Sequence, residues 1–467
     1  LKANGSISNW KSTPKWFANI ANFNLSSDGI KFISDNLGKK FNIPTIVTRF
    51  GNINYHGVIG GYGRDIYAKG RFATGAGYAI LVVGKHKQHL FGHIDTDGIN
   101  LKQVLANNDF GIIKTSIKID GEIPSNKKIN IKAKGAVSQF DYKSYTYNNI
   151  TIDGIFNNDV IGGEFCIDDP NGKINLKGSI DLSTKMHSAK LTAEVHHFNP
   201  SALKITDKWP DTNFDFNVSA NLSGKSINTI NGKLALSDFS MKSESRNYNL
   251  SLLCIKATNL QNSHNISLNS DFGNIVINGR YNFATIAQSF TNIICNKLPT
   301  FPGLMRSTHT DKNDFNIDAT IKKTDWLQQI FNFPLQIEEP LHIDGMINDK
   351  AKQIDITINM PNFIYNDKIY RNGYIHISSP NDTLKANAYV KKKSDNGHNL
   401  ELNIDASAIN NKLNTIISFK KNNFYNIHGI INTETQFFKS SVGTSSARIK
   451  VNPSNIFVGD TIWKVKP

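Results

Sequence analysis

Residues 145–182 decide the fold of this chain, and they read YTYNNITIDGIFNNDVIGGEFCIDDPNGKINLKGSIDL. Apolar and polar side chains alternate along this stretch, as in Phe165 and Ile167. A period of two puts alternate side chains on opposite faces of a β-strand, so one face is buried and the other is exposed to solvent. Residues 157–159 and 169–172 are rich in Asn, Asp, Pro and Gly, which form turns. The stretch therefore predicts successive short strands joined by tight turns.

The same alternation continues over most of the chain, with strand-like runs recurring every ~10–15 residues. This spacing predicts on the order of 25–30 strands, which is more than the ~10 that an open twisted sheet usually holds. A curled sheet in which each strand pairs only with its neighbours can hold ~25–30 strands. Its apolar faces would line a groove that runs along the length of the sheet. We therefore predict an all-β, elongated and repetitive curled sheet, an open β-groove. The residues expected to line the groove are Ile129, Ile131, Ile150, Ile152, Phe156, Phe165, Ile167, Ile174, Leu176, Ile180, Leu182, Leu191, Val195, Phe214, Phe216, Val218, Leu250, Leu252, Ile266, Leu268, Ile275, Ile277, Phe315, Ile317, Ile354, Ile356, Ile358, Leu400, Leu402 and Ile404.

Helix signals are few and short. Residues 28–38 begin with an acidic residue and end at a glycine, and residues 101–105 are long enough for a turn or two. The strongest signal is a stripe of apolar residues over 284–298 that ends before Pro299, and residues 326–331 are a further candidate. We expect short amphipathic helices at these four places.

No linker or change in composition divides the chain. The length of 467 residues would ordinarily suggest roughly three globular domains. The strand pattern nevertheless continues throughout, so we expect one continuous groove segment over residues 1–467. The last strand-like run, 456–465, has no polar capping element after it, and solenoids need such caps. We therefore expect the sequence to be a fragment of a longer protein.

Composition and charge restrict the classes of function. The formal net charge is +15, but the lysines are scattered, which argues against nucleic-acid binding as the main function. No run approaches the ~20 consecutive apolar residues of a membrane-spanning helix. Cys166, Cys254 and Cys295 lie far apart and predict neither a disulfide framework nor a metal-ligand pair. Cys254 continues the apolar parity of Leu250 and Leu252, so we expect a buried thiol.

A search for catalytic motifs finds little. Neighbouring residues on a strand face opposite ways, so His196 and His197 are not expected to hold one metal. Asp168 and Asp169 precede a proline and are better explained by turn chemistry than by acid–base catalysis. The glycine-rich segments 60–63 and 75–77 lack the helix that a phosphate-binding loop requires. We expect no catalytic residue, no metal site, no cofactor and no enzymatic activity.

Several segments resemble the repeats of the TamB family, the translocation and assembly module subunit of Gram-negative bacteria, and its Bacteroidetes branch most. Each match is short, but their order along the chain is more specific than any single one. The matching segments are residues 145–154, 163–170, 177–182, 191–195 with 199–203, 49–55 with Gly57, and 458–465.

The resemblance implies a fold and a function. TamB proteins belong with AsmA-like proteins and, more distantly, with bridge-like lipid-transfer proteins. Members have an inner-membrane anchor, a taco-shaped β groove through the periplasm, and a C-terminal region that meets an outer-membrane barrel of the assembly-factor (TamA-like) type. They are implicated in phospholipid transport to the outer membrane and in outer-membrane assembly. The expected partners are therefore phospholipid acyl chains and, through the parent protein, such a barrel. The residues themselves predict only the groove.

Three other functions compete with a lipid conduit. The main alternative is a periplasmic scaffold or chaperone that pairs client strands with an open sheet edge during insertion or secretion of outer-membrane proteins. An extracellular β-helix adhesin or carbohydrate-active enzyme would show clustered carboxylates or aromatic residues on the outer face, and the sequence shows neither. An outer-membrane barrel would need strands of ~9–11 residues with aromatic girdles, whereas these runs are shorter.

Overall fold

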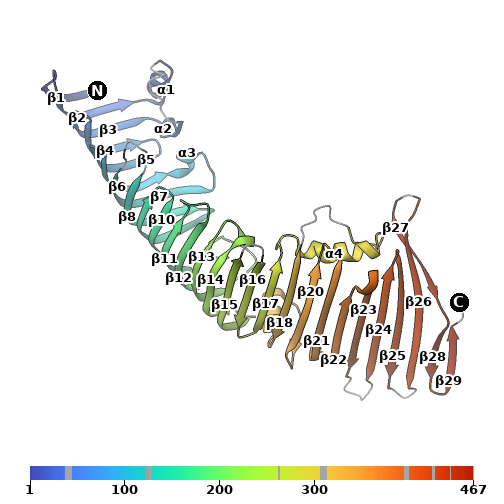
Figure 1. Cartoon of the computed structure of the whole chain (residues 1–467). Helices are drawn as coiled ribbons and strands as arrows, with labels where there is room; N and C mark the ends of the chain where they lie inside the picture. The colour runs from blue at the N-terminus through green and yellow to red at the C-terminus, as the bar shows by residue number, and fades with distance from the viewer. Residues whose placement is uncertain are drawn as a thin grey trace. The chain divides into compact units, whose positions relative to one another are not determined.

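The computed structural model describes residues 1–36, 45–122, 124, 129–260, 263–305, 313–393, 399–422, 426–441 and 443–465. About 67% of the chain is strand and 9% is helix. The described residues form 29 strands of one long antiparallel sheet that is not closed into a barrel (Figure 1). The predicted all-β class and strand number are thereby confirmed.

The short helices occur where the sequence predicts them. α1 covers Ser27–Asn36, so the predicted end at Gly38 lies outside the described residues. α3 covers Leu101–Leu105, α4 covers Ile286–Lys297, and α5 covers Asp325–Phe331. The described residues also include α2 (Thr45–Thr48) and the 3₁₀ turns η1 (Ile227–Thr229) and η2 (Pro380–Asp382).

The chain divides into two compact units, which the sequence pattern does not show. The first comprises Leu1–Asn221 with Phe239–Ser245, and the second comprises Leu222–Asp238 with Arg246–Pro467. Two strands contribute to both units, and each unit is described below by itself.

The first unit is a run of antiparallel strands in chain order, together with α1, α2 and α3. Several tight turns follow directly from the sequence. Lys143 and Ser144 both have positive φ, which gives the two-residue hairpin between Tyr142 and Tyr145 the type I′ twist that matches paired strands. Asn158 adopts the same left-handed region in the predicted turn at 157–159. The strands are β1 (Lys2–Ser8), β2 (Lys15–Leu25), β3 (Ile53–Tyr62), β4 (Asp65–Thr74), β5 (Gly77–His86), β6 (His89–Asn100), β7 (Phe110–Glu122), β8 (Asn130–Tyr142), β9 (Tyr145–Asn157), β10 (Val160–Asp169), β11 (Gly172–Asp181), β12 (His187–Phe198) and, shared with the second unit, β13 (Asn213–Gly224) and β14 (Asn231–Lys242).

The second unit continues the antiparallel order with one insertion. β18 pairs with β20, which follows it after the short β19. β19 itself pairs with the C-terminal end of β21. At the other end, β26 pairs with both β27 and β28. Residues 394–397 read SDNG, which also predicts a turn, but they lie outside the described residues. The strands are β15 (Asn247–Leu260), β16 (Ser263–Ser270), β17 (Gly273–Arg280), β18 (Asp314–Ile321), β19 (Leu335–Ile337), β20 (Leu341–Asn348), β21 (Gln353–Tyr365), β22 (Lys368–Ser378), β23 (Leu384–Lys392), β24 (Leu400–Ile409), β25 (Lys412–Lys421), β26 (Ile427–Lys439), β27 (Ser445–Val451), β28 (Ser454–Val458) and β29 (Thr461–Val465).

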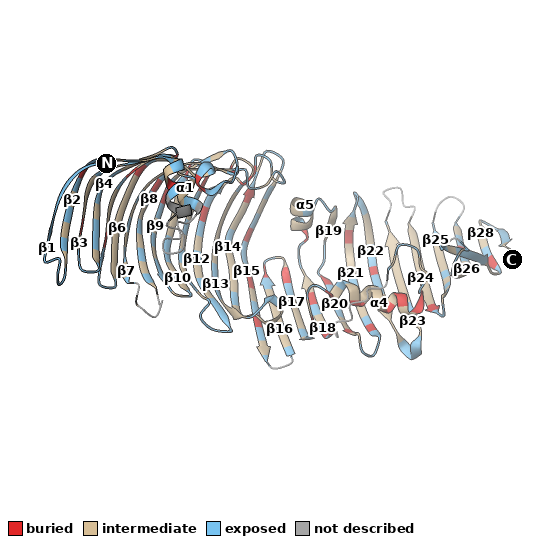
Figure 2. Ribbon diagram, turned by 90° about the horizontal axis from the view of Figure 1, so that it is seen from above, coloured by how far each residue is buried: buried red, intermediate tan, exposed pale blue. Residues whose placement is uncertain are grey.

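Buried side chains are sparse and are scattered along the strands (Figure 2). In the second unit they gather beneath α4, where Ile293 and Leu298 of the helix region pack with Phe315, Ile354 and Phe437 of the sheet. The amphipathic stripe predicted over 284–298 is therefore an apolar contact between this helix and the ends of several strands. Much of the remaining sheet surface is half-buried.

Candidate functional site

The cross-strand register of the first unit aligns small and apolar residues in one row across twelve strands. Residues directly opposite each other in a sheet face the same side, so the row defines one face. Phe165 lies opposite Ile152 on one side and Leu176 on the other. From β1 to β12 the row is Ala3, Ile20, Gly57, Gly70, Leu81, Ile94, Ile117, Gly135, Ile152, Phe165, Leu176 and Ala193.

Two rows on this face flank it over β8–β12, and they contain most of the predicted lining of the unit. Toward one strand end the row is Val137, Ile150, Ile167, Ile174 and Val195. Toward the other end it is Ile131, Phe156, Ile161, Ile180 and Ala189. Between that row and the central one, Leu191 lies opposite Gly178. Ile129 directly precedes β8 and Leu182 directly follows β11, at the same strand ends as Phe156. The face is consequently apolar over its whole width.

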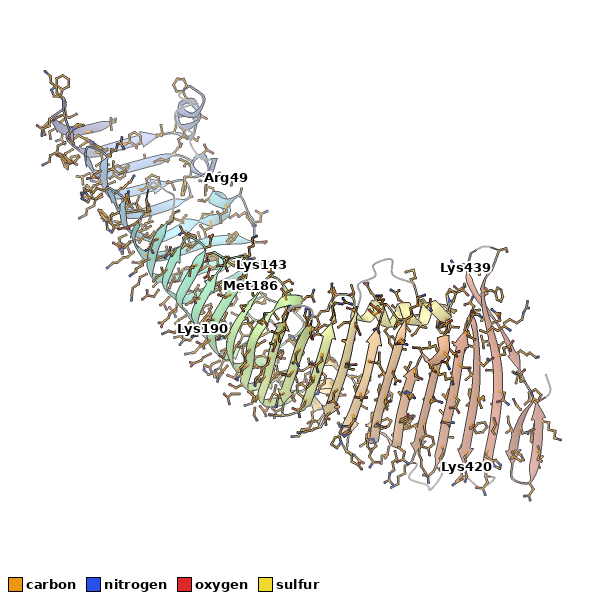
Figure 3. All side chains as sticks on the ribbon, viewed as in Figure 1. Arg49, Lys143, Met186, Lys190, Lys420 and Lys439 are labelled. Atoms are coloured by element: carbon orange, nitrogen blue, oxygen red, sulfur yellow. The ribbon has the colours of Figure 1, made fainter. Side chains whose placement is uncertain are left out.

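The opposite face of these strands is polar and charged. The Lys134 ammonium lies 2.6 Å from the Asp153 carboxylate, and Lys177 pairs with Glu164. Lys118 lies opposite Lys134 in the same cross-strand row. All four paired side chains are more than half exposed, so such ion pairs add little stability. Lys190 belongs to this face as well (Figure 3). This charged face is the solvent-exposed side of the sheet, as the alternation of apolar and polar residues predicts.

One strand-end border of the apolar face is closed. Ile150 and Val195 are buried there, beside the loop that contains the buried Leu203. The Tyr147 hydroxyl donates to the Leu203 carbonyl at 3.0 Å and ties this loop to β9. Asp169 is 2% exposed and accepts hydrogen bonds from the Tyr145 hydroxyl, from the Asn148 N–H at 3.0 Å and from the Asn171 N–H at 2.9 Å. Asp169 therefore organises a turn, as predicted.

The other border is open to solvent. Phe156, Ile161 and Ile180 are adjacent in one row, and their side chains remain 42%, 50% and 41% exposed. Between this row and the central one lies a cavity of about 220 Å³, lined by residues that include Ile152, Phe165, Leu176 and Leu191 over Gly154, Gly163 and Gly178. The apolar face of β9–β11 is therefore accessible to a ligand from this border.

The second unit repeats this arrangement with bulkier residues. From β15 to β26 one row is Ile255, Leu268, Ile275, Ala319, Ile343, Ile358, Ile375, Ala388, Ile404, Ile417 and Ile431. The adjacent row contains the predicted Ile266, Ile277, Ile317 and Ile356, and the next one contains Phe315 and Ile354. Leu400 and Leu402 are four and two residues before Ile404 on β24, so they point to the same face of the sheet as Ile404. These predicted residues thus share one face.

An apolar cavity of about 320 Å³ opens on this face. Its lining includes Ile358, Ile375, Leu402 and Ile404 from the rows, together with the stacked rings of Phe363 and Tyr370, whose centroids are 5.0 Å apart. α4 covers the sheet at one strand end, where Ser289 donates to Asp349 at 2.7 Å and the Lys297 ammonium pairs with Asp382. The face is thus partly covered by a helix and partly hollow.

Predicted lining residues near the boundary between the units are placed differently. Phe214 and Phe216 both contact the ring of Phe239, at centroid distances of 6.1 and 6.4 Å, and Val218 is half-buried. On β15 the residue that belongs to the apolar row is Ile255. The predicted Leu252 is three residues before it, and its side chain is 42% exposed. Residues three apart on a regular strand face opposite ways, so Leu252 does not share the face of Ile255. Leu250 and Cys254 have the same parity as Leu252 but are buried, as was expected for Cys254.

The expectation that His196 and His197 point to opposite faces of a strand is wrong. His197 has a φ of 51°, which interrupts the strand alternation. The Nδ1 atoms of His196 and His197 consequently lie 3.8 and 3.9 Å from the same Asp215 carboxylate oxygen. Both rings are more than half exposed, and among the described residues no group of three His, Cys, Asp or Glu side chains could hold a metal ion.

The described part of the chain contains no helix that is long and apolar enough to cross a membrane. No protein-family model, no curated protein and no solved structure matches the chain. The geometry of the two apolar faces is therefore the basis for a functional proposal.

Proposed function

We propose that the chain is part of a lipid conduit, in which acyl chains lie against the apolar face of the sheet. The observation that carries this proposal is the exposure of aligned apolar rows. Phe156, Ile161 and Ile180 are each about half exposed, although they belong to a face that is apolar across many strands. Contiguous apolar surface of this kind marks a binding surface and not a packed core.

The energetics favour acyl chains as the occupant. Burying one CH₂ group contributes ~0.8 kcal/mol, so a tail of ~15 carbons gains on the order of 10 kcal/mol relative to water. Dispersion contacts with aliphatic rows have no preferred register, so a bound tail can slide from one strand to the next. The cavities of about 220 and 320 Å³ on the two faces provide concave apolar sites along such a path.

The resemblance to TamB proteins supplies the cellular setting of the proposal. The parent protein would be anchored in the inner membrane, would cross the periplasm and would deliver phospholipid to the outer membrane near a TamA-like barrel. The residues that contact lipid would be groove residues such as Leu176 and Leu402. No catalytic step, metal or cofactor is part of this function.

The test is to identify what the purified chain binds. We expect organic extraction followed by mass spectrometry to recover phospholipid in near-stoichiometric amounts. A photoreactive amino acid at Phe165 or Ile358 should crosslink to lipid, whereas one at Thr192, on the polar face, should not. Recovery of no lipid, or equal crosslinking from both faces, would contradict the conduit.

The scaffold alternative makes a different prediction in the same experiment. A chain that pairs with client strands would use the backbone of a sheet edge, so crosslinks to unfolded outer-membrane proteins would arise at edge positions. They would not depend on Phe165 or Ile358. Protein crosslinks without lipid crosslinks would therefore favour the scaffold.

A further inference from the structure

A second hollow lies on the polar face of the second unit, over strands β23–β26 and β28. Its volume is about 490 Å³, which is within the range of small-molecule sites, roughly 300–1,000 Å³. Lys420, which lines it, is labelled in Figure 3. The lining residues are Tyr389, Glu401, Asn403, Ser418, Phe419, Lys420, His428, Gly429, Ile430, Asn455 and Phe457.

Strand register shows that all but two of the lining residues face away from the apolar rows. The exceptions are Phe419 and Gly429, which lie in the same row as Leu402. One row consists of Glu401, Lys420, His428 and Phe457, and the next consists of Tyr389, Asn403, Ser418, Ile430 and Asn455. Leu402 and Ile404 alternate with Glu401 and Asn403 along β24, so they lie on the other side of the sheet. The polar side chains of the hollow consequently lie on the opposite side of the sheet from the proposed lipid surface.

Aromatic rings border the hollow. The rings of His428 and Phe457 are stacked, with centroids 4.6 Å apart and planes inclined by 6°. Tyr389 supplies a further ring from β23. These three residues come from three different strands and share a face that otherwise carries mostly Lys, Asn, Ser and Asp side chains. Aromatic rings on a solvent-exposed face provide a flat apolar surface beside polar groups.

Polar groups with free hydrogen-bonding capacity lie between these rings. Within the described residues, neither the Ser418 hydroxyl nor the Asn455 amide has a hydrogen-bond partner. The Asn403 amide donates to Asp405 at 2.8 Å, which leaves its carbonyl oxygen available. The Lys391 ammonium holds the Glu401 carboxylate at 2.8 Å, and this hydrogen bond lowers the pKa of Glu401. The hollow thus presents a hydroxyl, two amides and a fixed carboxylate.

We infer that this hollow binds a hexopyranose saccharide. A sugar ring has an apolar C–H face that fits an aromatic ring, and a rim of hydroxyls that both donate and accept hydrogen bonds. The stacked rings and Tyr389 match the first property, and Ser418, Asn403 and Asn455 match the second. A peptide strand would instead need a free sheet edge, and the backbones of β24 and β25 are paired on both sides.

The test uses the full chain with cellobiose and chitobiose as probes, measured by saturation-transfer NMR and titration calorimetry. The decisive variant is Ser418→Leu, which places a bulky apolar side chain on the floor of the hollow. Its matched control is Asn414→Leu, on the same strand and the same face but outside the hollow. Circular dichroism of both variants checks that the sheet is intact.

We expect at least one disaccharide to bind the wild type with saturable transfer to its ring protons. Ser418→Leu should reduce the affinity at least tenfold, whereas Asn414→Leu should leave it unchanged. Tyr389→Ala should also weaken binding, because it removes a ring. Absence of binding to the wild type, or equal affinity of Ser418→Leu and wild type, would overturn the inference. Lipid binding should be the same in all variants, so the outcome is independent of the proposed conduit.

Discussion

Phe165 on β10 lies directly opposite Leu176 on β11, in the central apolar row of the first unit. One position along, Glu164 and Lys177 form an ion pair on the other face of the same two strands. The two faces of one hairpin therefore differ completely in polarity. This difference allows variants that alter one face while leaving the other intact.

We predict that Leu176→Asp abolishes movement of lipid along the groove. The carboxylate would stand in the central row, where a desolvated charge costs several kcal/mol and where any water drawn in interrupts the apolar lining. The measurement is transfer of a fluorescent phospholipid between vesicles by the purified protein, with circular dichroism to verify folding.

The control for Leu176→Asp follows from the ion pairs. Lys177→Asp would remove the partner of Glu164 and place two carboxylates side by side. Thr192→Asp is the better control, because Thr192 is exposed on the polar face and lies opposite Lys177. Thr192→Asp should transfer lipid at the normal rate. Normal transfer by a folded Leu176→Asp variant would show that the row is not part of the path.

Asp169→Asn should destabilise the first unit by about 1–3 kcal/mol. The Asp169 carboxylate accepts from two backbone N–H groups and from the Tyr145 hydroxyl, and an amide can present only one oxygen to these donors. A buried donor without a partner costs ~1–3 kcal/mol. Urea unfolding followed by circular dichroism measures the change in the free energy of unfolding.

The neighbouring Asp168 provides the comparison for Asp169. Its carboxylate is 2.8 Å from the Lys173 ammonium, but both side chains are at least 60% exposed. Asp168→Asn should therefore leave the unfolding midpoint nearly unchanged. Equal effects of the two substitutions would show that the buried turn network does not stabilise the unit.

The sequence predicts the sheet well because its information is local. Alternation and turn residues are enough to place Ile152, Phe165 and Leu176 on one face, and the four short helices are marked by apolar stripes and end signals. Differences within that face depend on distant segments. Ile150 is buried while Phe156 is exposed, and a loop that contains Leu203, more than 45 residues away, lies at the closed border. No pattern within β9 contains that information.

The saccharide hollow could not be predicted for a related reason. Tyr389, His428 and Phe457 are 39 and 29 residues apart, and each belongs to a different strand. The pairing of β23 with β24, of β24 with β25, of β25 with β26 and of β26 with β28 brings them to one place. Strand register is set by long-range pairing, so outer-face clusters are not visible in the sequence.

The pair between Lys297 and Asp382 predicts an asymmetric response in the second unit. The Lys297 side chain is only 5% exposed, whereas that of Asp382 is 83% exposed, and the ion pair lowers the pKa of Asp382. Asp382→Ala leaves a buried ammonium without its carboxylate, so it should lower the thermal unfolding midpoint. Lys297→Met replaces the ammonium with an apolar group of similar length and should have a smaller effect. A larger loss with Lys297→Met would contradict this.

Stability should decrease at alkaline pH through buried tyrosines. Burial raises the pKa of Tyr281 to about 12, and burial together with the hydrogen bond to Asp169 raises that of Tyr145 to about 12. The ordinary pKa of a tyrosine in an unfolded chain is about 10. A raised folded-state pKa means that the folded protein holds the phenol proton more tightly than the unfolded chain does. The resulting stability is fully present below pH 10 and is lost as the pH rises from 10 to about 12.

Phenylalanine substitutions separate the contributions of the two tyrosines. Tyr281 is 3% exposed, and its hydroxyl has no hydrogen-bond partner among the described residues. Tyr281→Phe therefore removes a buried polar group at no cost in hydrogen bonds, so neutral-pH stability should be unchanged or higher by up to about 1–2 kcal/mol. Tyr145→Phe removes a donor to Asp169 and should destabilise the protein at neutral pH. Both variants should lose less stability than the wild type between pH 10 and 12. Urea unfolding at pH 7 and at several pH values from 9.5 to 12 distinguishes the cases, and a Tyr281→Phe variant with the full alkaline loss would assign that loss to other groups.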